Sequence, residues 1–236
     1  MNTELIIHRA QVYGFLAEMF SYPQENWTED APLLTEIVMG LGDLPALPHI
    51  PLMTLEELQA AHRHTFGTAG SLCYETEYGL PHEYRQSQEM ADIAGFYRAF
   101  GFDLGGTVRE RPDHVAVELE FMHILALKEA QAWQMGQPEY VDICTDAERK
   151  FMTDHLGRWF DLFAQSVAHN APDSVYKPAA QLASTFVWTE ATKLGITLTR
   201  PRLADVQHTP FDPDFSCASC TIPATGHNCI PLSTIP

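Results

Sequence analysis

The residues best suited to bind a metal ion lie near the C-terminal end of the sequence. Cys217, Cys220, His227 and Cys229 place three thiols and one imidazole within residues 217–229. Thiolates and imidazoles are the ligands of structural zinc sites, and four of them complete a closed tetrahedral site. Only the first pair has the two-residue gap common in zinc fingers, so a redox-active Cys-x-x-Cys pair and three unliganded thiols remain open as alternatives. Zinc is the one cofactor that this pattern suggests.

A second group of polar side chains stands at the start of an apolar segment. Pro112, Asp113 and His114 come directly before it, and Glu118 follows one helical turn after His114. As an ordinary helix start, Pro112 suits the first turn and Asp113 can bond the free backbone amides. His114 and Glu118, four residues apart, share one face and can pair. As a recognition site, the same residues form a polar surface at the mouth of a buried helix, where His114 would make binding sensitive to pH.

A third group lies in the glycine-bordered loop CYETEYG, residues 73–79. Tyr74, Glu75, Glu77 and Tyr78 place two aromatic rings and two carboxylates close together. Aromatic faces hold guanidinium groups and carboxylates bind them through paired hydrogen bonds, so a groove lined by these residues suits arginine ligands. The alternative is a loop whose tyrosines pack onto the body of the protein.

The elements that must position these residues are helices, because apolar residues recur with helical periodicity and strand-like alternation is scarce. Thr54 followed by Glu57 has the spacing of a capping box, and an interruption is expected near Cys144. The pattern predicts an all-α, single-domain bundle of about seven helices over residues 1–200, followed by an irregular tail rich in proline and cysteine over residues 201–236. The expected helices cover about residues 1–20, 28–39, 55–66, 87–100, 112–133, 139–168 and 174–195.

Composition narrows the function classes. Against 14 basic residues stand 31 acidic ones, a net charge of −17, which argues against nucleic acid or an anionic membrane as partner. Such a charge favours a basic partner, or it serves solubility alone. No apolar run is long enough to insert into a membrane. Five cysteines without a secretion signal predict a reducing compartment, the cytoplasm.

Catalytic signatures are missing from the sequence. It has no nucleotide-binding glycine loop, no nucleophile elbow and no zinc-protease helix. Glu118 and Glu120 are two residues apart, so on a helix they cannot face each other as an acid/base pair. We therefore expect no enzyme, and the rival to a binding protein is a metal-binding or thiol-redox protein that acts through the C-terminal Cys/His cluster.

Four segments together resemble a known family. RAQVYGFLAEMFSYP, YETEYG, MADIAGFYRAFGFDL and ERPDHVAVELEFMHILALKEAQA occur in the order and spacing of redox-enzyme maturation proteins of the TorD/DmsD/NarJ type. The resemblance covers about residues 8–195 and is greatest to the branch that serves type II enzymes of the DMSO reductase family. It implies a cytoplasmic, non-catalytic, all-α chaperone.

The resemblance also implies a partner and a site. Such chaperones bind the twin-arginine leader or an N-terminal segment of a molybdoenzyme catalytic subunit, hold the apoenzyme during molybdenum cofactor insertion and delay its export. Pro112, Asp113 and His114 occupy the family's recognition motif, with Glu118 one turn on. The loop motif is occupied by Tyr74, Glu75, Glu77 and Tyr78. On this basis we expect a monomer or homodimer whose client contacts these eight residues.

Overall fold

The computed structural model describes residues 3–42, 44, 49–67, 70–78, 85–102 and 110–203. Within these ranges the chain forms eight α-helices and two short 3-10 helices, η1 (Trp27–Glu29) and η2 (Glu75–Glu77). The α-helices are α1 (Thr3–Phe20), α2 (Ala31–Leu41), α3 (Leu55–Phe66), α4 (Arg85–Ala99), α5 (Val115–Gln134), α6 (Pro138–Asp154), α7 (Leu156–Asn170) and α8 (Tyr176–Lys193). The predicted all-α bundle is confirmed, with one helix more than expected.

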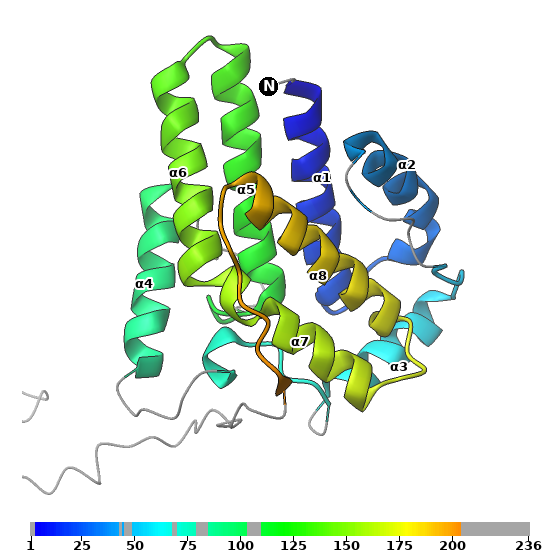
Figure 1. Ribbon diagram of the computed structural model, residues 1–236. Helices are drawn as coiled ribbons and strands as arrows, with labels where there is room; N and C mark the ends of the chain where they lie inside the picture. Colours follow the sequence, from blue (N-terminus) through cyan, green and yellow to red (C-terminus); the bar gives the residue numbers. More distant parts are fainter. Residues whose placement is uncertain are drawn as a thin grey trace, which may run out of the picture.

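Helix α5 is the centre of the bundle. It packs most extensively against α1 on one side and α6 on the other, and these three long helices stand side by side in Figure 1. Leu119, Phe121, Met122 and Leu125 are fully buried within it. A helix that is apolar on nearly every side is stable only when other elements surround it, as the sequence predicted for this segment.

Local signals place several helix ends where the sequence predicted them. Thr54 and Glu57 form a reciprocal capping box at the start of α3. The Ser174 hydroxyl accepts the Tyr176 N–H at the start of α8, at 3.3 Å. Gly195 has a φ of 74°, a left-handed conformation that glycine adopts without steric cost, and it ends that helix. These ends depend on contacts between near neighbours in sequence.

The break between α6 and α7 lies elsewhere than predicted. Cys144, near which we expected it, is buried within α6, and the chain turns instead at His155. A β-carbon on Gly157 would lie 2.4 Å from the Met152 carbonyl oxygen, so this corner requires a glycine. The corner is therefore specified by a close approach of the backbone at Gly157. The periodicity of apolar residues does not report such an approach.

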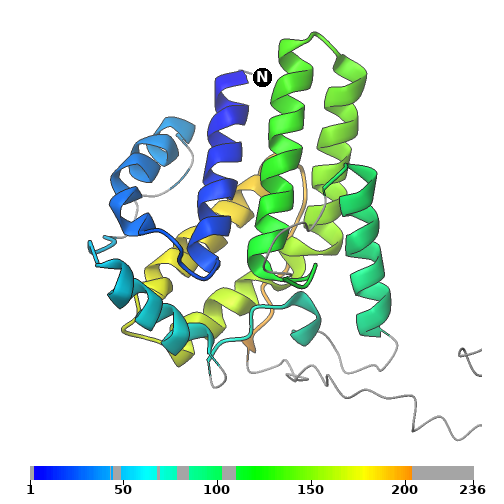
Figure 2. The same ribbon diagram turned by 180° about the vertical axis from the view of Figure 1, so that it is seen from behind.

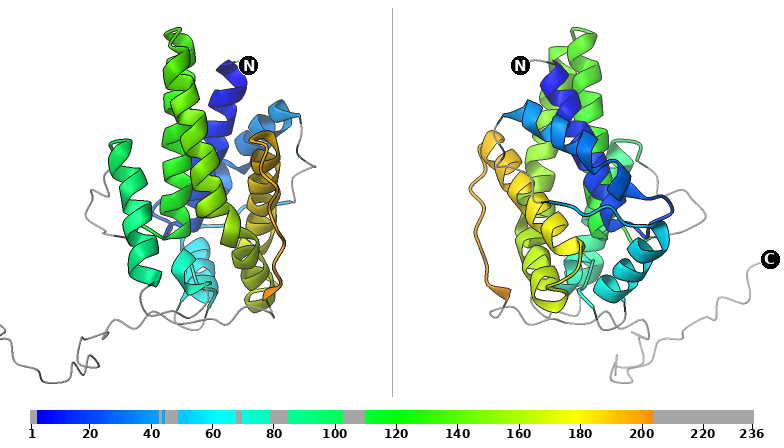
Figure 3. Two further views of the ribbon diagram at one scale, coloured as in Figure 1. Left: turned by 60° about the vertical axis from the view of Figure 1, so that its left-hand side comes forward. Right: turned by 90° about the vertical axis from the view of Figure 1, so that its right-hand side faces the viewer.

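Beyond α8, residues 196–203 run back along α7 and α8 (Figure 3). The Gln165 side chain fixes their end, donating to the Pro201 carbonyl at 2.9 Å and accepting the Leu203 N–H at 3.1 Å. The remainder of the predicted tail, residues 204–236, lies outside the described part of the chain. None of the helices in the described ranges is both long and apolar enough to cross a membrane.

Candidate functional site

The loop motif and the recognition motif form one unit. Tyr74 and His114 make an antiparallel β-bridge. Beside it, the Glu75 N–H donates to the Asp113 carbonyl at 2.9 Å and the Val115 N–H donates to the Cys73 carbonyl at 2.8 Å. Figure 2 shows the segment that carries η2 passing beneath the lower end of α5. Two motifs that are far apart in sequence are therefore joined by their backbones.

Asp113 links the two motifs through its side chain. Its carboxylate accepts the Thr76 hydroxyl at 2.7 Å and the Thr76 N–H at 3.3 Å. It also accepts two hydrogen bonds from the Arg111 guanidinium, at 3.0 and 2.7 Å. Because the side chain is fully buried, these bonds satisfy a charge that would otherwise be costly.

The predicted helix start is corrected by three residues. Helix α5 begins at Val115, and its cap is His114, whose Nδ1 accepts the Ala116 N–H at 3.2 Å. Asp113 does not cap this helix because its carboxylate is turned toward η2. Pro112 precedes the first turn, and its carbonyl accepts the Tyr97 hydroxyl at 2.7 Å.

His114 and Glu118 have different partners rather than each other. His114 is buried against the edge of the Tyr74 ring, and burial lowers the pKa of its imidazole. The predicted pH response of His114 is therefore expected at a lower pH than for an ordinary histidine. Glu118 is fully buried and accepts the Trp159 Nε1–H at 3.0 Å. Burial, followed by the charge of Glu75, raises the pKa of Glu118 well above its ordinary value.

Glu75 connects this site to the corner between α6 and α7. Its carboxylate lies 3.1 Å from Nδ1 of His155, and the Asp92 carboxylate lies 3.3 Å from Nε2. Burial opposes the charged imidazolium, but the hydrogen bond and charge of Glu75, with the charge of Asp92, outweigh it and raise the pKa of His155. Sequence reasoning missed His155 and Trp159. The signal available in the sequence was their spacing of four residues within the stretch 139–168, which was predicted to be helical.

The two tyrosines of the loop differ in environment. Tyr78 is buried against Trp159, with ring centroids 5.4 Å apart, and donates to the Leu72 carbonyl at 2.7 Å. It follows the alternative prediction, a tyrosine packed onto the body of the protein. Tyr74 is partly exposed and donates to Glu110 at 3.0 Å. Burial, followed by the charge of Glu110, raises the pKa of Tyr74.

An arginine does occupy the acidic, aromatic site, but it belongs to this chain. The guanidinium carbon of Arg111 lies 4.2 Å from the centre of the Tyr74 ring. Its Nη1 is 3.8 Å from the Glu77 carboxylate, and its Nη2 donates to the Thr76 hydroxyl at 2.8 Å. The Arg111 side chain is 22% exposed, whereas Asp113 is fully buried. The surface edge of the site is therefore made by Tyr74, Glu110 and Arg111.

The predicted zinc ligands lie outside the described residues, so zinc binding at Cys217, Cys220, His227 and Cys229 stays a prediction. In the described ranges, no group of three or more histidine, cysteine, aspartate and glutamate side chains is arranged to hold a metal ion. Burial raises the pKa of the Cys73 thiol, and it does the same for Cys144. Neither thiol therefore has the lowered pKa of a reactive cysteine.

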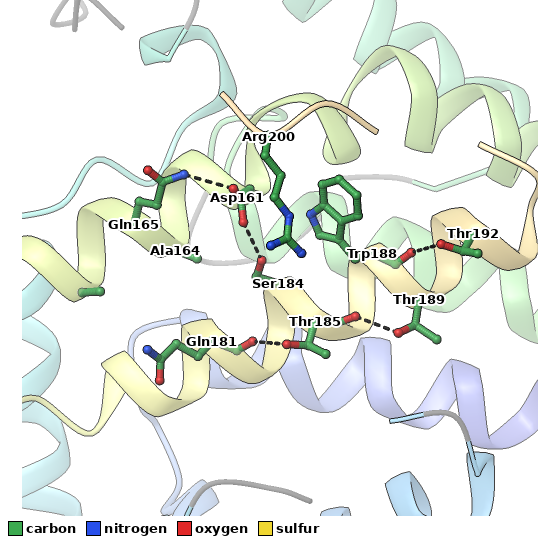
Figure 4. A pocket seen from close by; sticks show the side chains of 11 residues that line it. Asp161, Ala164, Gln165, Gln181, Ser184, Thr185, Trp188, Thr189, Thr192 and Arg200 are labelled. Atoms are coloured by element: carbon green, nitrogen blue, oxygen red, sulfur yellow. Dashed lines mark hydrogen bonds between the residues drawn. The ribbon is translucent and has the colours of Figure 1, made fainter. Parts of the chain in front are cut away.

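A separate groove of about 500 Å³ lies between α7 and α8 (Figure 4). Arg200 lies over the Trp188 ring at 4.4 Å. Asp161 accepts hydrogen bonds from Ser184 and Gln165, both at 3.0 Å. The groove contains no residue of the predicted site. The polar contacts of Asp161 are made within the protein itself, so they identify no ligand.

Both motifs lie in a region of sequence similarity to known proteins. The family described as "Nitrate reductase delta subunit" matches residues 25–165, a range that includes both motifs. The chain is 29% identical over 200 residues to the chlorate reductase assembly chaperone protein of Ideonella dechloratans, covering 83% of this chain and 95% of that one. It is 29% identical over 201 residues to the selenate reductase assembly chaperone protein of Thauera selenatis, covering 84% and 94%. It is also 27% identical over 103 residues to the chaperone protein TorD of Vibrio cholerae, covering 44% of each.

Proposed function

The chain belongs to the nitrate reductase delta subunit family, and from this membership we propose that it is an assembly chaperone for the catalytic subunit of a molybdenum-containing reductase. The observation that carries the proposal is the coverage of the relatives. The match to the two reductase assembly chaperones extends over more than nine tenths of each of them. These relatives are named as assembly chaperones, and we infer the same non-catalytic role for this chain.

We infer that the chaperone acts in the cytoplasm and binds the N-terminal twin-arginine leader of the catalytic subunit. It holds the apoenzyme until the molybdenum cofactor is inserted, and export is delayed until then. A leader of this kind presents paired arginines followed by an apolar stretch, and the net charge of −17 favours a basic partner.

The joined motifs support this location for the client. Tyr74 and Glu110 stand at the surface edge, and the buried carboxylates of Glu77 and Asp113 lie behind them. Aromatic faces and carboxylates together recognise guanidinium groups. Asp113 and Glu118 are fully buried, so their part is to support the surface rather than to touch a client in the described conformation.

Affinity purification from the native host under anaerobic conditions tests the proposal. We expect the full chain to retain a molybdoenzyme catalytic subunit, identified by mass spectrometry. A double substitution at the surface edge, Tyr74→Ala with Glu110→Gln, should reduce the amount recovered. Tyr140→Ala is the matched control, because Tyr140 is an exposed tyrosine on α6 outside the site. Recovery of no reductase subunit by the unsubstituted chain would overturn the proposal.

The same experiment separates the rival function. Removing residues 204–236 deletes Cys217, Cys220, His227 and Cys229 and leaves the described helices intact. A chaperone whose client binds at the joined motifs should recover its reductase subunit at full yield. A metal-binding or thiol-redox protein acting through those residues should lose its bound metal or its activity. Native mass spectrometry of both forms reports metal content directly.

A further inference from the structure

We propose that the Arg111 guanidinium is the resident ligand of an arginine-binding subsite, and that an arginine of the client binds there by displacing it. The subsite consists of Tyr74, Thr76, Glu77 and Asp113, and we call it the guanidinium cradle. The inference rests on the proposed function, because it gives one arginine of the client a particular receptor on the chaperone.

The contacts of the cradle select a planar guanidinium. Asp113 binds Arg111 through both carboxylate oxygens, with Nε at 3.0 Å and Nη2 at 2.7 Å, while the Tyr74 ring covers the guanidinium face at 4.2 Å. Such a fork of N–H donors on a carboxylate, with an aromatic face above it, fits arginine and not the compact ammonium of lysine. The ligand class is therefore an arginine side chain.

Tyr74, Thr76 and Asp113 of the cradle are held by bonds that do not involve the Arg111 side chain. Asp113 accepts both the hydroxyl and the backbone N–H of Thr76, and its carbonyl accepts the Glu75 N–H at 2.9 Å. The Tyr74 ring is held by its hydroxyl, which donates to Glu110. When Arg111 leaves, these bonds keep the shape of the site. The cradle is thus a receptor built independently of its occupant.

Arg111 is placed where it can be exchanged. Its side chain is 22% exposed and covers Asp113, which is fully buried. It stands in the turn before α5, where the His114 N–H donates to the Arg111 carbonyl at 3.1 Å, so its side chain can swing outward while the helix stays in place. Departure alone would leave the Asp113 carboxylate buried without a cation, which is costly. Exchange with a second guanidinium removes that cost.

An internal ligand weakens binding of the external one. The apparent affinity falls by the fraction of time that the subsite is open, so a cradle open one tenth of the time binds about tenfold more weakly than an open one. Arg111 therefore lowers the apparent affinity for the client, so that the client can be released. Removing the Arg111 guanidinium should raise that affinity.

Calorimetric titration of the full chain tests this with two peptides. One peptide has paired arginines followed by an apolar segment, and the other has lysines in their place. Arg111→Gln should raise the affinity for the arginine peptide about tenfold and leave that for the lysine peptide within about twofold. Arg149→Gln is the matched control, since it removes the same charge from an exposed pair with Asp146 and should change neither affinity. Unchanged or weaker binding of the arginine peptide by folded Arg111→Gln would overturn the inference.

A second measurement uses the unsubstituted chain and does not depend on the variant's folding. The Arg111 guanidinium lies over the face of the Tyr74 ring. Its Nε–H NMR signal should therefore carry a ring-current shift that the arginine peptide abolishes and the lysine peptide leaves unchanged. A signal that keeps its shift while the arginine peptide is bound overturns the inference. If the chain recovers a reductase subunit from its host but binds neither peptide, the chaperone role stands and the cradle inference fails. Recovery of no subunit overturns the function itself.

Discussion

Helix α5 has a cluster of one arginine and several carboxylates near each of its ends, and the two clusters differ in how their residues are brought together. The first cluster lies at the C-terminal half of α5. There, Arg9 of α1 donates to Glu129 of α5 at 2.9 Å and to Glu148 of α6 at 2.6 Å, and it also donates to Glu190 of α8. We call these four residues the Arg9 cluster. They come from four different helices, the first and last of which are 181 residues apart at Arg9 and Glu190.

The guanidinium cradle at the other end of α5 is built from two short contiguous segments of the chain. Arg111 and Asp113 are two residues apart, and the Tyr74, Thr76 and Glu77 side chains that contact them come from residues 74–77. The Arg111 side chain is 22% exposed and that of Arg9 is 9% exposed. A buried arginine that ties four helices is part of the fold, whereas an arginine at a surface edge with nearby partners can be exchanged.

The charge balance of the Arg9 cluster makes it sensitive to substitution and to pH. One guanidinium faces three buried carboxylates, and Lys193 lies 3.3 Å from Glu190. Burial, opposed by Arg9 and reinforced by Glu129, raises the pKa of Glu148 to about 7. Between about pH 4.5 and pH 7 the folded chain therefore retains on Glu148 a proton that the unfolded chain releases.

Arg9→Met should lower the free energy of unfolding more than any of the other substitutions. It leaves the three carboxylates buried without their cation, and breaking a buried ion pair from one side costs about 3–5 kcal/mol. Urea denaturation followed by circular dichroism measures the free energy of unfolding. The affinity of the remaining folded protein for the arginine peptide should be unchanged, because the cradle is formed by other residues. A loss below about 1 kcal/mol would mean that packing alone fixes α1.

Glu148→Gln should change the pH dependence of stability. The folded-state pKa of about 7 lies above the ordinary value of 4.5, so the folded chain binds this proton more tightly than the unfolded chain. The stabilisation is complete below pH 4.5 and is lost as the pH rises through 7, a total of about 3 kcal/mol. The variant should lack this loss and should therefore be the more stable form above pH 7. Denaturation at a series of pH values, with Asp146→Asn as an exposed control on the same helix, gives the difference directly.

The same contrast explains what the sequence could predict. Tyr74, Glu77 and Asp113 of the cradle were recognised as candidates because each motif is contiguous, CYETEYG and Pro-Asp-His, and contiguous motifs are visible without a fold, whereas Thr76 was not singled out. Arg9, Glu129, Glu148 and Glu190 were not, because their meeting depends on how four helices pack. The helices themselves were predicted from apolar periodicity, which reports the buried face of each but not its partners.

The errors have a similar cause. The break at His155 depends on the approach of Gly157 to Met152, and the displaced start of α5 depends on Asp113 turning toward η2. The first is a backbone approach across the corner and the second is a tertiary contact, and apolar periodicity reports neither. That Arg111 fills the site offered to an arginine could not be read from composition, because its direction depends on the backbone pairing of the two motifs.

Asp113→Asn should have an intermediate effect, and it acts on the cradle. The amide cannot accept both Arg111 bonds, and hydrogen bonds to a charged group contribute about 1.5–3 kcal/mol. We expect a loss of about 2 kcal/mol in the free energy of unfolding together with weaker binding of the arginine peptide. Asp146→Asn, at an exposed position, should change the stability by less than about 0.5 kcal/mol. A variant as stable as the unsubstituted chain would show that the backbone pairing alone joins the motifs.

Tyr74→Leu should have the smallest effect on stability, and it decides whether the two clusters really differ. The substitution removes the ring above the guanidinium, and a partly exposed cation–π contact contributes about 0.5–1 kcal/mol. Affinity for the arginine peptide should fall about two- to fivefold, while the free energy of unfolding changes by less than about 1 kcal/mol. Tyr140→Leu, on the exposed face of α6, should change neither. If Tyr74→Leu instead destabilised the fold as strongly as Arg9→Met, the cradle would be a second structural cluster, because an aromatic wall that carries the fold cannot also serve an exchangeable ligand.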